Sequence, residues 1–161
     1  MEKQKRVLDV CCGGRTFYFD KENPDIIFHD RRVMQPEIVG SGKNARTRKC
    51  LPDVIGDFRG LKFGDSSFDM VVFDPPHLKT LGEGSYMIKM YGKLDPDTWR
   101  EDLRAGFSEC FRVLKENGTL IFKWNEYEIP LREVLKLTDR KPLFGHPSGK
   151  QQKTHWVAFM K

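Results

Sequence analysis

The chain has 161 residues, of which 39% are hydrophobic and 12% aromatic, which is enough for one folded domain with a substantial core. No apolar run approaches the roughly 20 residues that a membrane-spanning helix needs, and residues 1–6 lack the apolar region of a signal peptide. We therefore expect no membrane contact, a cytoplasmic location and a single domain over residues 1–161. The net charge of +5 permits nucleic-acid binding without demonstrating it.

Short apolar segments alternate with longer mixed segments, which is typical of βαβ units around a parallel sheet. The predicted strands are Arg6–Val10, Asp25–His29, Asp53–Asp57, Phe68–Phe73 and Thr119–Trp124. Between the first two strands there is room for a helix of about three turns at most. Residues 31–52 contain Gly, Pro and basic residues in place of a helical period, so we predict a loop there. These features predict an α/β fold, doubly wound and Rossmann-like, with a mainly parallel sheet and reduced helices. Missing helical cover is consistent with a homodimer.

The predicted helices lie in the second half of the chain. A long helix over Asp97–Lys115 follows from apolar residues that recur at spacings of three or four, namely Trp99, Leu103, Phe107, Cys110 and Leu114. Asp95 and Pro96 suit its start, and Asn117–Gly118 suit its end. A shorter helix is predicted over Leu131–Leu137, and closing strands around Leu143–Phe144 and His155–Met160.

The four cysteines are spaced unlike metal ligands. Cys11 and Cys12 are adjacent, whereas Cys50 and Cys110 stand alone. We predict that all four are reduced packing residues and that there is no metal site.

Each of the first three strands ends in residues suited to binding a ligand. The first runs into a glycine turn, residues 11–15, where a ligand can approach the backbone closely. The second ends at Asp30, whose carboxylate suits a ribose diol, although a turn or cap explains it equally well. The third ends at Asp57, which suits an adenine amino group or an ion pair with Arg59.

The fourth strand carries the most informative motif. In the strand Phe68–Phe73, the part Met70–Phe73 shows no polar alternation, as expected for a strand covered on both faces, and the strand is followed by Asp74-Pro75-Pro76-His77. Two prolines lack N–H donors and fix φ, so the strand stops there. Asp74 and His77 are thereby placed at the carboxyl edge of the sheet, where open α/β sheets bind ligands.

These four strand ends, in this order, resemble those of class I S-adenosylmethionine-dependent methyltransferases. Gly64–Phe73 and the helix–turn–strand passage Glu109–Leu120 are similar to the same family, so the resemblance covers nearly the whole chain. It implies S-adenosylmethionine as cofactor and S-adenosylhomocysteine as product. The implied cofactor-binding residues are Asp9, Cys11, Cys12, Gly13, Gly14, Asp30, Asp57, Phe58 and Asp74.

The Asp-Pro-Pro motif resembles the site of methyltransferases that act on nitrogens of nucleobases in DNA or RNA. There Asp74 and the Pro75 carbonyl accept N–H hydrogens of the acceptor, which directs its nitrogen lone pair at the methyl group. A flat residue at position 77 stacks on the base. Catalytic roles are thus implied for Asp74, Pro75 and His77. Two residues depart from the pattern: His77 replaces the usual aromatic residue, and Arg15 replaces a glycine and either pairs with the cofactor carboxylate or points to solvent, which we favour slightly.

Several alternatives stay open. DNA methyltransferases of the type that the motif resembles carry a separate target-recognition region, for which these 161 residues leave no room. This and His77 favour a small-molecule or protein methyltransferase. Lys123 with Asp74 resembles the lysine-based site of ribose methyltransferases. A third hypothesis is a catalytically silent, cofactor-binding subunit that binds DNA or RNA through the basic segment 43–49. Residues 79–93 form either a lid over the substrate or a polar surface loop. His146 and His155 are expected to be structural, hydrogen-bonded histidines.

Overall fold

The computed structural model describes residues 5–82 and 84–161. Residues 1–4, from the segment predicted to lack a signal peptide, and Glu83, from the predicted loop 79–93, lie outside the described residues. Among the helices within these ranges, none is long and apolar enough to cross a bilayer.

The centre of the fold is a seven-stranded, mainly parallel sheet. Its strands are β1 (Val7–Asp9), β2 (Ile26–Asp30), β5 (Val54–Ile55), β6 (Phe68–Phe73), β7 (Leu114–Asn125), β8 (Phe144–Ser148) and β9 (Thr154–Met160). They are ordered β5-β2-β1-β6-β7-β9-β8, and the first five are parallel to one another. β9 is antiparallel to both of its neighbours, β7 and β8. The five parallel strands follow the third-second-first-fourth-fifth order of a doubly wound sheet, which confirms the predicted fold class.

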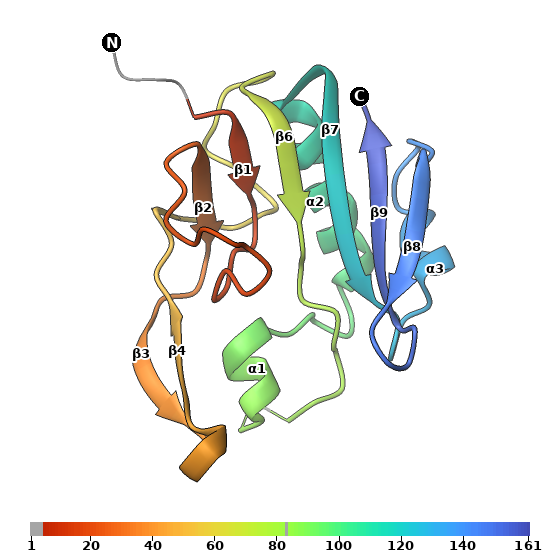
Figure 1. The fold of residues 1–161 in the computed structure, drawn as a ribbon. Helices are drawn as coiled ribbons and strands as arrows, with labels where there is room; N and C mark the ends of the chain where they lie inside the picture. Colours follow the sequence, from red (N-terminus) through yellow and green to blue (C-terminus); the bar gives the residue numbers. More distant parts are fainter. Residues whose placement is uncertain (1–4, 83) are drawn as a thin grey trace.

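One face of the sheet is covered by α2 (Trp99–Val113), which lies behind β6 and β7 in Figure 1. Its predicted apolar stripe is buried against alternate residues of the central strands, and these side chains form the main core. The short α3 (Leu131–Leu135) adds Val134 to this core and is two residues shorter than predicted.

The predicted ends of the long helix are wrong by a few residues. Asp95 does not cap α2; its carboxylate instead accepts the Asp97 N–H, holding the turn before the helix, which begins after Thr98. At the other end the backbone becomes extended at Leu114, because Leu114 already pairs with Phe68 of β6. Asn117, predicted to end the helix, lies within β7 with a φ of 63°.

The opposite face is covered mainly by loops. Tyr18, from the connection between β1 and β2, packs edge-on against Phe28, and a small cluster of Cys12, Ile26 and Phe28 is buried beneath this connection. Farther along the same face, Met160 is about half exposed. The prediction of reduced helices is therefore confirmed, most clearly on this face.

Residues 31–52 were expected to form a loop, and this expectation is wrong. They form an antiparallel hairpin of β3 (Met34–Val39) and β4 (Arg46–Cys50), with a 3₁₀ turn, η1 (Gly42–Asn44), at its tip. The hairpin extends beyond the carboxyl ends of the parallel strands, at the same end of the sheet as α1 (Tyr86–Tyr91) (Figure 1). α1 itself lies within the predicted loop 79–93.

Candidate active site

The ends of the parallel strands surround two neighbouring cavities. The first, of about 310 Å³, is lined by residues at or after the ends of β2 and β5, including Asp30, Gly56 and Phe58. The second, of about 230 Å³, is lined by the glycine turn after β1, by Asp74, Pro75 and His77 after β6, and by Lys123 of β7. Cys11 and Arg32 line both cavities. The fold therefore brings most of the predicted site residues together.

The glycine turn is built as its sequence requires. Gly13 has a φ of 48°, in the left-handed region that glycine adopts without a steric penalty. Its N–H donates to Asp30 Oδ2 at 2.9 Å, which joins the turn to the end of β2. A Cβ on Gly14 would lie 3.3 Å from the Lys49 carbonyl oxygen, so the hairpin packs closely against the turn.

Arg15 does not point to solvent, and its expected orientation was wrong. Only 8% of the residue is exposed, and its guanidinium donates to the carbonyl oxygens of Lys21 and of Leu51, the latter at 2.8 Å. It also lies 3.8 Å from the centre of the Phe28 ring. Arg15 thus fastens the β1–β2 connection to the segment after the hairpin, and it lines neither cavity.

Asp30 is almost fully buried and accepts four hydrogen bonds. Gly13 N–H and Arg32 Nη2 donate to Oδ2, and Arg32 N–H and Nε donate to Oδ1, at 2.8 to 3.0 Å. Burial alone would raise the pKa of this carboxyl, but the adjacent guanidinium and backbone donors bring it below its usual value. Arg32 also donates to the Met90 carbonyl oxygen of α1 at 2.7 Å.

At the end of the third predicted strand, Asp57 forms an ion pair and the next residue, Phe58, lines the first cavity. Asp57 is held by the guanidinium of Arg59, at 2.7 and 3.0 Å, which was the alternative interpretation of this residue. This ion pair holds the pKa of Asp57 below its ordinary value. Phe58, rather than Asp57, lines the first cavity. The predicted strand Asp53–Asp57 is reduced to Val54–Ile55, and Asp53 instead accepts the Phe28 N–H.

Asp9 ends β1 and is fully buried. Cys11 N–H donates to its Oδ1 at 3.2 Å, while within the described part of the chain neither its Oδ2 nor the buried Tyr18 hydroxyl has a partner at hydrogen-bond geometry. Burial raises the pKa of Asp9 to about 7; the nearby Tyr18 hydroxyl opposes the rise and the Asp74 charge adds to it. This is a carboxyl whose ionisation the fold penalises.

Asp74 pairs with a lysine at the end of the neighbouring strand. Lys123 Nζ donates to Asp74 Oδ2 at 2.7 Å, and the same ammonium lies 5.4 and 5.7 Å from the ring centres of Phe17 and Trp156. Burial raises the pKa of Asp74 while the Lys123 charge opposes the rise. No residue in ranges 5–82 and 84–161 donates to Oδ1, and strand pairing ends at Phe73. Oδ1 and the Pro75 carbonyl are therefore available to a ligand.

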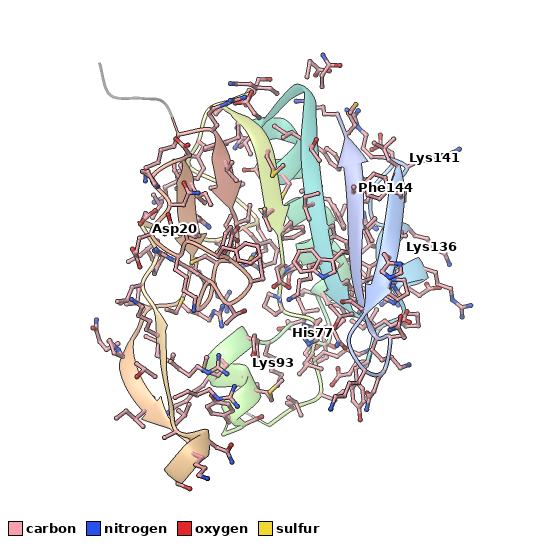
Figure 2. The ribbon with its side chains drawn as sticks, in the orientation of Figure 1. Asp20, His77, Lys93, Lys136, Lys141 and Phe144 are labelled. Atoms are coloured by element: carbon pink, nitrogen blue, oxygen red, sulfur yellow. The ribbon has the colours of Figure 1, made fainter. Side chains whose placement is uncertain are left out.

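His77 and α1 form the outer wall of the second cavity. Burial and the Lys123 charge lower the pKa of His77 to about 4, so the imidazole is neutral near pH 7. Met87, Met90 and Tyr91 of α1 line the same cavity. Figure 2 shows His77 and Lys93 at the carboxyl end of the parallel strands, close to α1.

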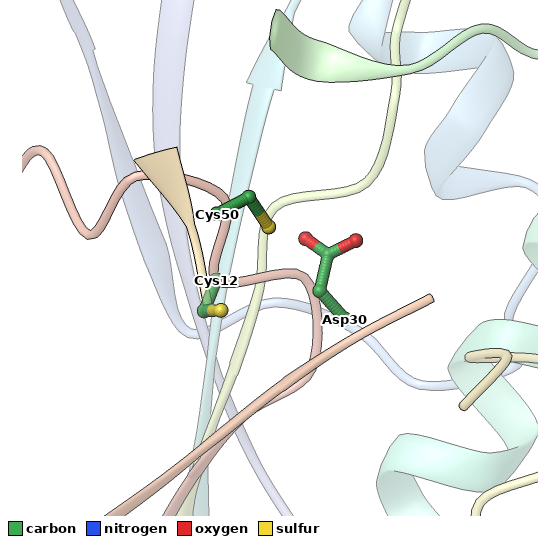
Figure 3. A group of neighbouring side chains, drawn as sticks. All are labelled: Cys12, Asp30 and Cys50. Atoms are coloured by element: carbon green, nitrogen blue, oxygen red, sulfur yellow. The ribbon is translucent and has the colours of Figure 1, made fainter. Parts of the chain in front are cut away.

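The fold also gathers three possible metal ligands that the sequence keeps apart. Ligand atoms of Cys12, Asp30 and Cys50 lie within 4.8 Å of one another (Figure 3). A carboxylate has about four acceptor positions, and those of Asp30 are already filled by donors that include the Arg32 cation. A metal would have to displace Arg32, so the cluster does not favour a metal as the side chains stand. Absence of a metal stays a prediction.

His146 and His155 lie outside both cavities. His155 is partly buried and its Nε2 lies 3.0 Å from Glu126 Oε1, but among the described residues this nitrogen has no partner at hydrogen-bond geometry, so only the ion-pair contact agrees with the expected structural role. His146 is exposed on β8, and the expectation of a structural role was wrong there. The residue that sequence reasoning missed is Arg32. The spacing of Asp30 and Arg32 in the sequence could have indicated this role, because an arginine two residues after a strand-end aspartate can fold back onto that carboxylate.

Comparisons with known proteins agree with this geometry at the level of the fold. Neither the search with family models nor the search of curated proteins gives a match. A solved structure of a protein from Pyrococcus horikoshii OT3 has a TM-score of 0.57 at 18% identity, over 99% of this chain and 83% of that one. A TehB-like SAM-dependent methyltransferase from Corynebacterium glutamicum has a TM-score of 0.56 at 13% identity, over 100% and 82%. A SAM-dependent methyltransferase from Methanosarcina mazei has a TM-score of 0.52 at 12% identity, over 100% and 94%. The chain therefore has the fold of the SAM-dependent methyltransferases.

Proposed function

We propose that this protein is an S-adenosylmethionine-dependent methyltransferase that transfers a methyl group to a nucleobase nitrogen in DNA or RNA. The observation that carries the proposal is that Asp74, Pro75 and His77 line the same cavity as the glycine turn of residues 11–14. A methyl donor held by the turn would therefore face an acceptor held by the motif. Homodimer formation remains a separate prediction.

The cavity residues fit this cofactor chemically. Asp30 offers a carboxylate for a ribose diol, Phe58 an aromatic surface for adenine, and Arg32 a cation for the amino-acid carboxylate. When bound, S-adenosylmethionine supplies an electrophilic methyl group on a sulfonium. Asp9, whose buried Oδ2 has no partner among the described residues, comes just before the turn, and a positive ligand there would favour its ionised form.

The acceptor would be held by the Asp74 motif. Lys123 keeps Asp74 Oδ2, so Oδ1 and the Pro75 carbonyl can each accept one hydrogen of an amino group. Holding both hydrogens aligns the nitrogen lone pair with the methyl group and stabilises the charge that develops on nitrogen. His77, neutral near pH 7, provides a flat surface for the base. We propose that α1 and the described residues on either side of it, within 79–82 and 84–93, serve as a lid.

The hairpin supports nucleic acid as the acceptor. Lys43, Arg46 and Lys49 are exposed on a projection that extends past the sheet at the same end as the cavities (Figure 1). We expect a Lys43→Glu/Arg46→Glu variant to weaken nucleic-acid binding and to lower its salt slope by about one per lost phosphate contact. Lys136→Glu/Lys141→Glu is the matched control, since it reverses the same number of charges at two lysines that lie on the β8 side of the molecule (Figure 2).

The decisive test combines cofactor binding with methyl transfer. Calorimetry should show binding of S-adenosylhomocysteine, and labelled methyl should pass to nucleic acid in wild type but not in Asp74→Ala, with Asp139→Ala as an exposed control. Absence of cofactor binding refutes the methyltransferase. Transfer only to small molecules or proteins refutes the nucleobase acceptor. Cofactor and nucleic-acid binding without turnover of any acceptor identifies a silent subunit.

A hydroxyl acceptor is the second candidate, and the 2.7 Å contact between Lys123 and Asp74 favours it. A lysine beside the acceptor can remove a hydroxyl proton once it is itself neutral. Lys123→Met separates the two: it should abolish transfer to a ribose hydroxyl but leave part of the transfer to a base, because Asp74 can still accept N–H hydrogens. Mass spectrometry of the product nucleosides shows whether base or ribose carries the methyl.

A further inference from the structure

Arg32 lies at the junction of the two cavities and joins the end of β2 to the proposed lid. Its Nε and Nη2 donate to the two oxygens of Asp30, while Nη1 donates to the Met90 carbonyl oxygen of α1. About a quarter of the side chain is exposed, and it lines both cavities. Any ligand that extends from one cavity to the other therefore passes this guanidinium.

The hydrogen bonds of Asp30 create a conflict with cofactor binding. Its four acceptor positions are filled by two backbone N–H groups, of Gly13 and Arg32, and by two N–H groups of the Arg32 side chain. The backbone donors are fixed by the fold. A ribose diol can therefore reach Asp30 only by displacing the guanidinium.

A displaced guanidinium needs a new anionic partner, because it remains partly buried. The second cavity has no other free cation among its described lining residues: Lys123 is paired with Asp74, and His77 is neutral near pH 7. With the ribose at Asp30 and the methyl group facing Asp74, the methionine end of the cofactor lies in this cavity. Its carboxylate matches the planar fork of an arginine.

We propose that Arg32 exchanges partners when cofactor binds: the ribose hydroxyls replace it on Asp30, and its guanidinium pairs with the cofactor carboxylate. Arg32 is then a specificity-determining residue, which admits ligands that carry both groups and disfavours nucleosides that carry only the diol. A nucleoside frees the guanidinium without bringing an anion, and so leaves this partly buried charge with only Asp74, whose carboxylate already pairs with Lys123. The inference rests on the proposed methyltransferase function.

The test compares two ligands that differ in this carboxylate. S-Adenosylhomocysteine has it, whereas 5′-methylthioadenosine has the adenine, ribose and sulfur without it. By calorimetry, wild type should prefer S-adenosylhomocysteine strongly. Arg32→Ala should bind S-adenosylhomocysteine about 10- to 100-fold more weakly, the range expected for lost charged hydrogen bonds, yet bind methylthioadenosine at least as tightly as wild type, because Asp30 is freed.

Two further variants keep the test falsifiable. Arg32→Lys keeps the positive charge and thereby protects folding, but it lacks the planar guanidinium. It should therefore lose part of the preference for S-adenosylhomocysteine over methylthioadenosine. Arg31→Ala, on the neighbouring arginine that lines only the first cavity, should leave the ratio of the two affinities unchanged. Equal weakening of both ligands in the Arg32 variants, or no weakening of S-adenosylhomocysteine, overturns the partner exchange. Failure of wild type to bind S-adenosylhomocysteine instead overturns the proposed function together with it.

Discussion

The buried carboxyl of Asp9 should make the stability of this protein fall as pH rises. Its pKa in the folded protein is about 7, against an ordinary value of 3.8, so the folded state holds the Asp9 proton more tightly than the unfolded state does. The folded protein therefore loses stability as pH rises from about 4 to 7, at about 1.4 kcal/mol per pH unit. An asparagine side chain cannot ionise, so Asp9→Asn removes this loss.

The size of the expected stability change follows from the two pH values, 5 and 8, at which the free energy of unfolding would be measured. From pH 5 to pH 7 the cost of ionising Asp9 grows by about 2 kcal/mol, and above pH 7 it grows by less than about 1 kcal/mol more before it becomes constant. We expect the free energy of unfolding of Asp9→Asn, relative to wild type, to be about 3 kcal/mol higher at pH 8 than at pH 5. Any pH-independent cost of the new amide cancels in this difference.

Urea denaturation followed by tryptophan fluorescence measures this quantity, since Trp99 and Trp124 are buried. Asp139→Asn, at an exposed carboxylate, should show no such pH dependence. If the difference between Asp9→Asn and wild type stays within about 0.5 kcal/mol from pH 5 to pH 8, the reasoning about Asp9 is wrong.

Three further predictions test other parts of the site. Gly106→Ala places a Cβ 2.7 Å from Phe73 and 2.8 Å from Phe58, so it should destabilise the fold by about 1–3 kcal/mol in urea and weaken S-adenosylhomocysteine binding by shifting Phe58. Arg15→Met leaves two carbonyl oxygens without their charged donor and should cost about 3 kcal/mol of unfolding free energy, whereas a solvent-facing arginine would cost almost nothing. His77→Phe should keep the shape of the pH–rate profile between pH 5 and 8, because the pKa of His77 is about 4; a break in that range that disappears in the variant would contradict this.

The central sheet and the long helix could be predicted because their buried apolar residues follow the period of a strand or a helix along the sequence. Phe68–Phe73 was predicted with the bounds that β6 has: its apolar residues, interrupted only by Asp69, indicate the strand, and the two prolines after Asp74 determine where it ends. The stripe from Trp99 to Leu114 was likewise found buried. The hairpin shows no such apolar period. Ile38 of β3 is largely exposed, and β4 consists mainly of polar and basic residues. Because neither strand buries one face, the alternation that would identify a strand is missing from the sequence.

The sequence predicted which residues lie in the candidate site, but not which of their side chains form ion pairs. Strand ends locate Asp30, Asp57 and Asp74, because parallel strands finish at one edge of the sheet. Each of these aspartates turned out to have a cationic partner, Arg32, Arg59 and Lys123 respectively. A local pair such as Asp57 with Arg59 can be anticipated from sequence, whereas the contact of Asp74 with Lys123 depends on the adjacency of β6 and β7.

The unequal covering of the two sheet faces has a consequence for how the molecule opens. Around α2, buried aromatic and aliphatic side chains form one continuous core, so amide protons of β6 and β7 should exchange with deuterium only through global unfolding. The β1–β2 connection and the hairpin rely instead on a small apolar cluster and on contacts such as those of Arg15. Amide protons there should exchange through local openings that cost less free energy than global unfolding. Because these same segments form the glycine turn and its surroundings, a bound ligand should slow exchange there far more than in the core.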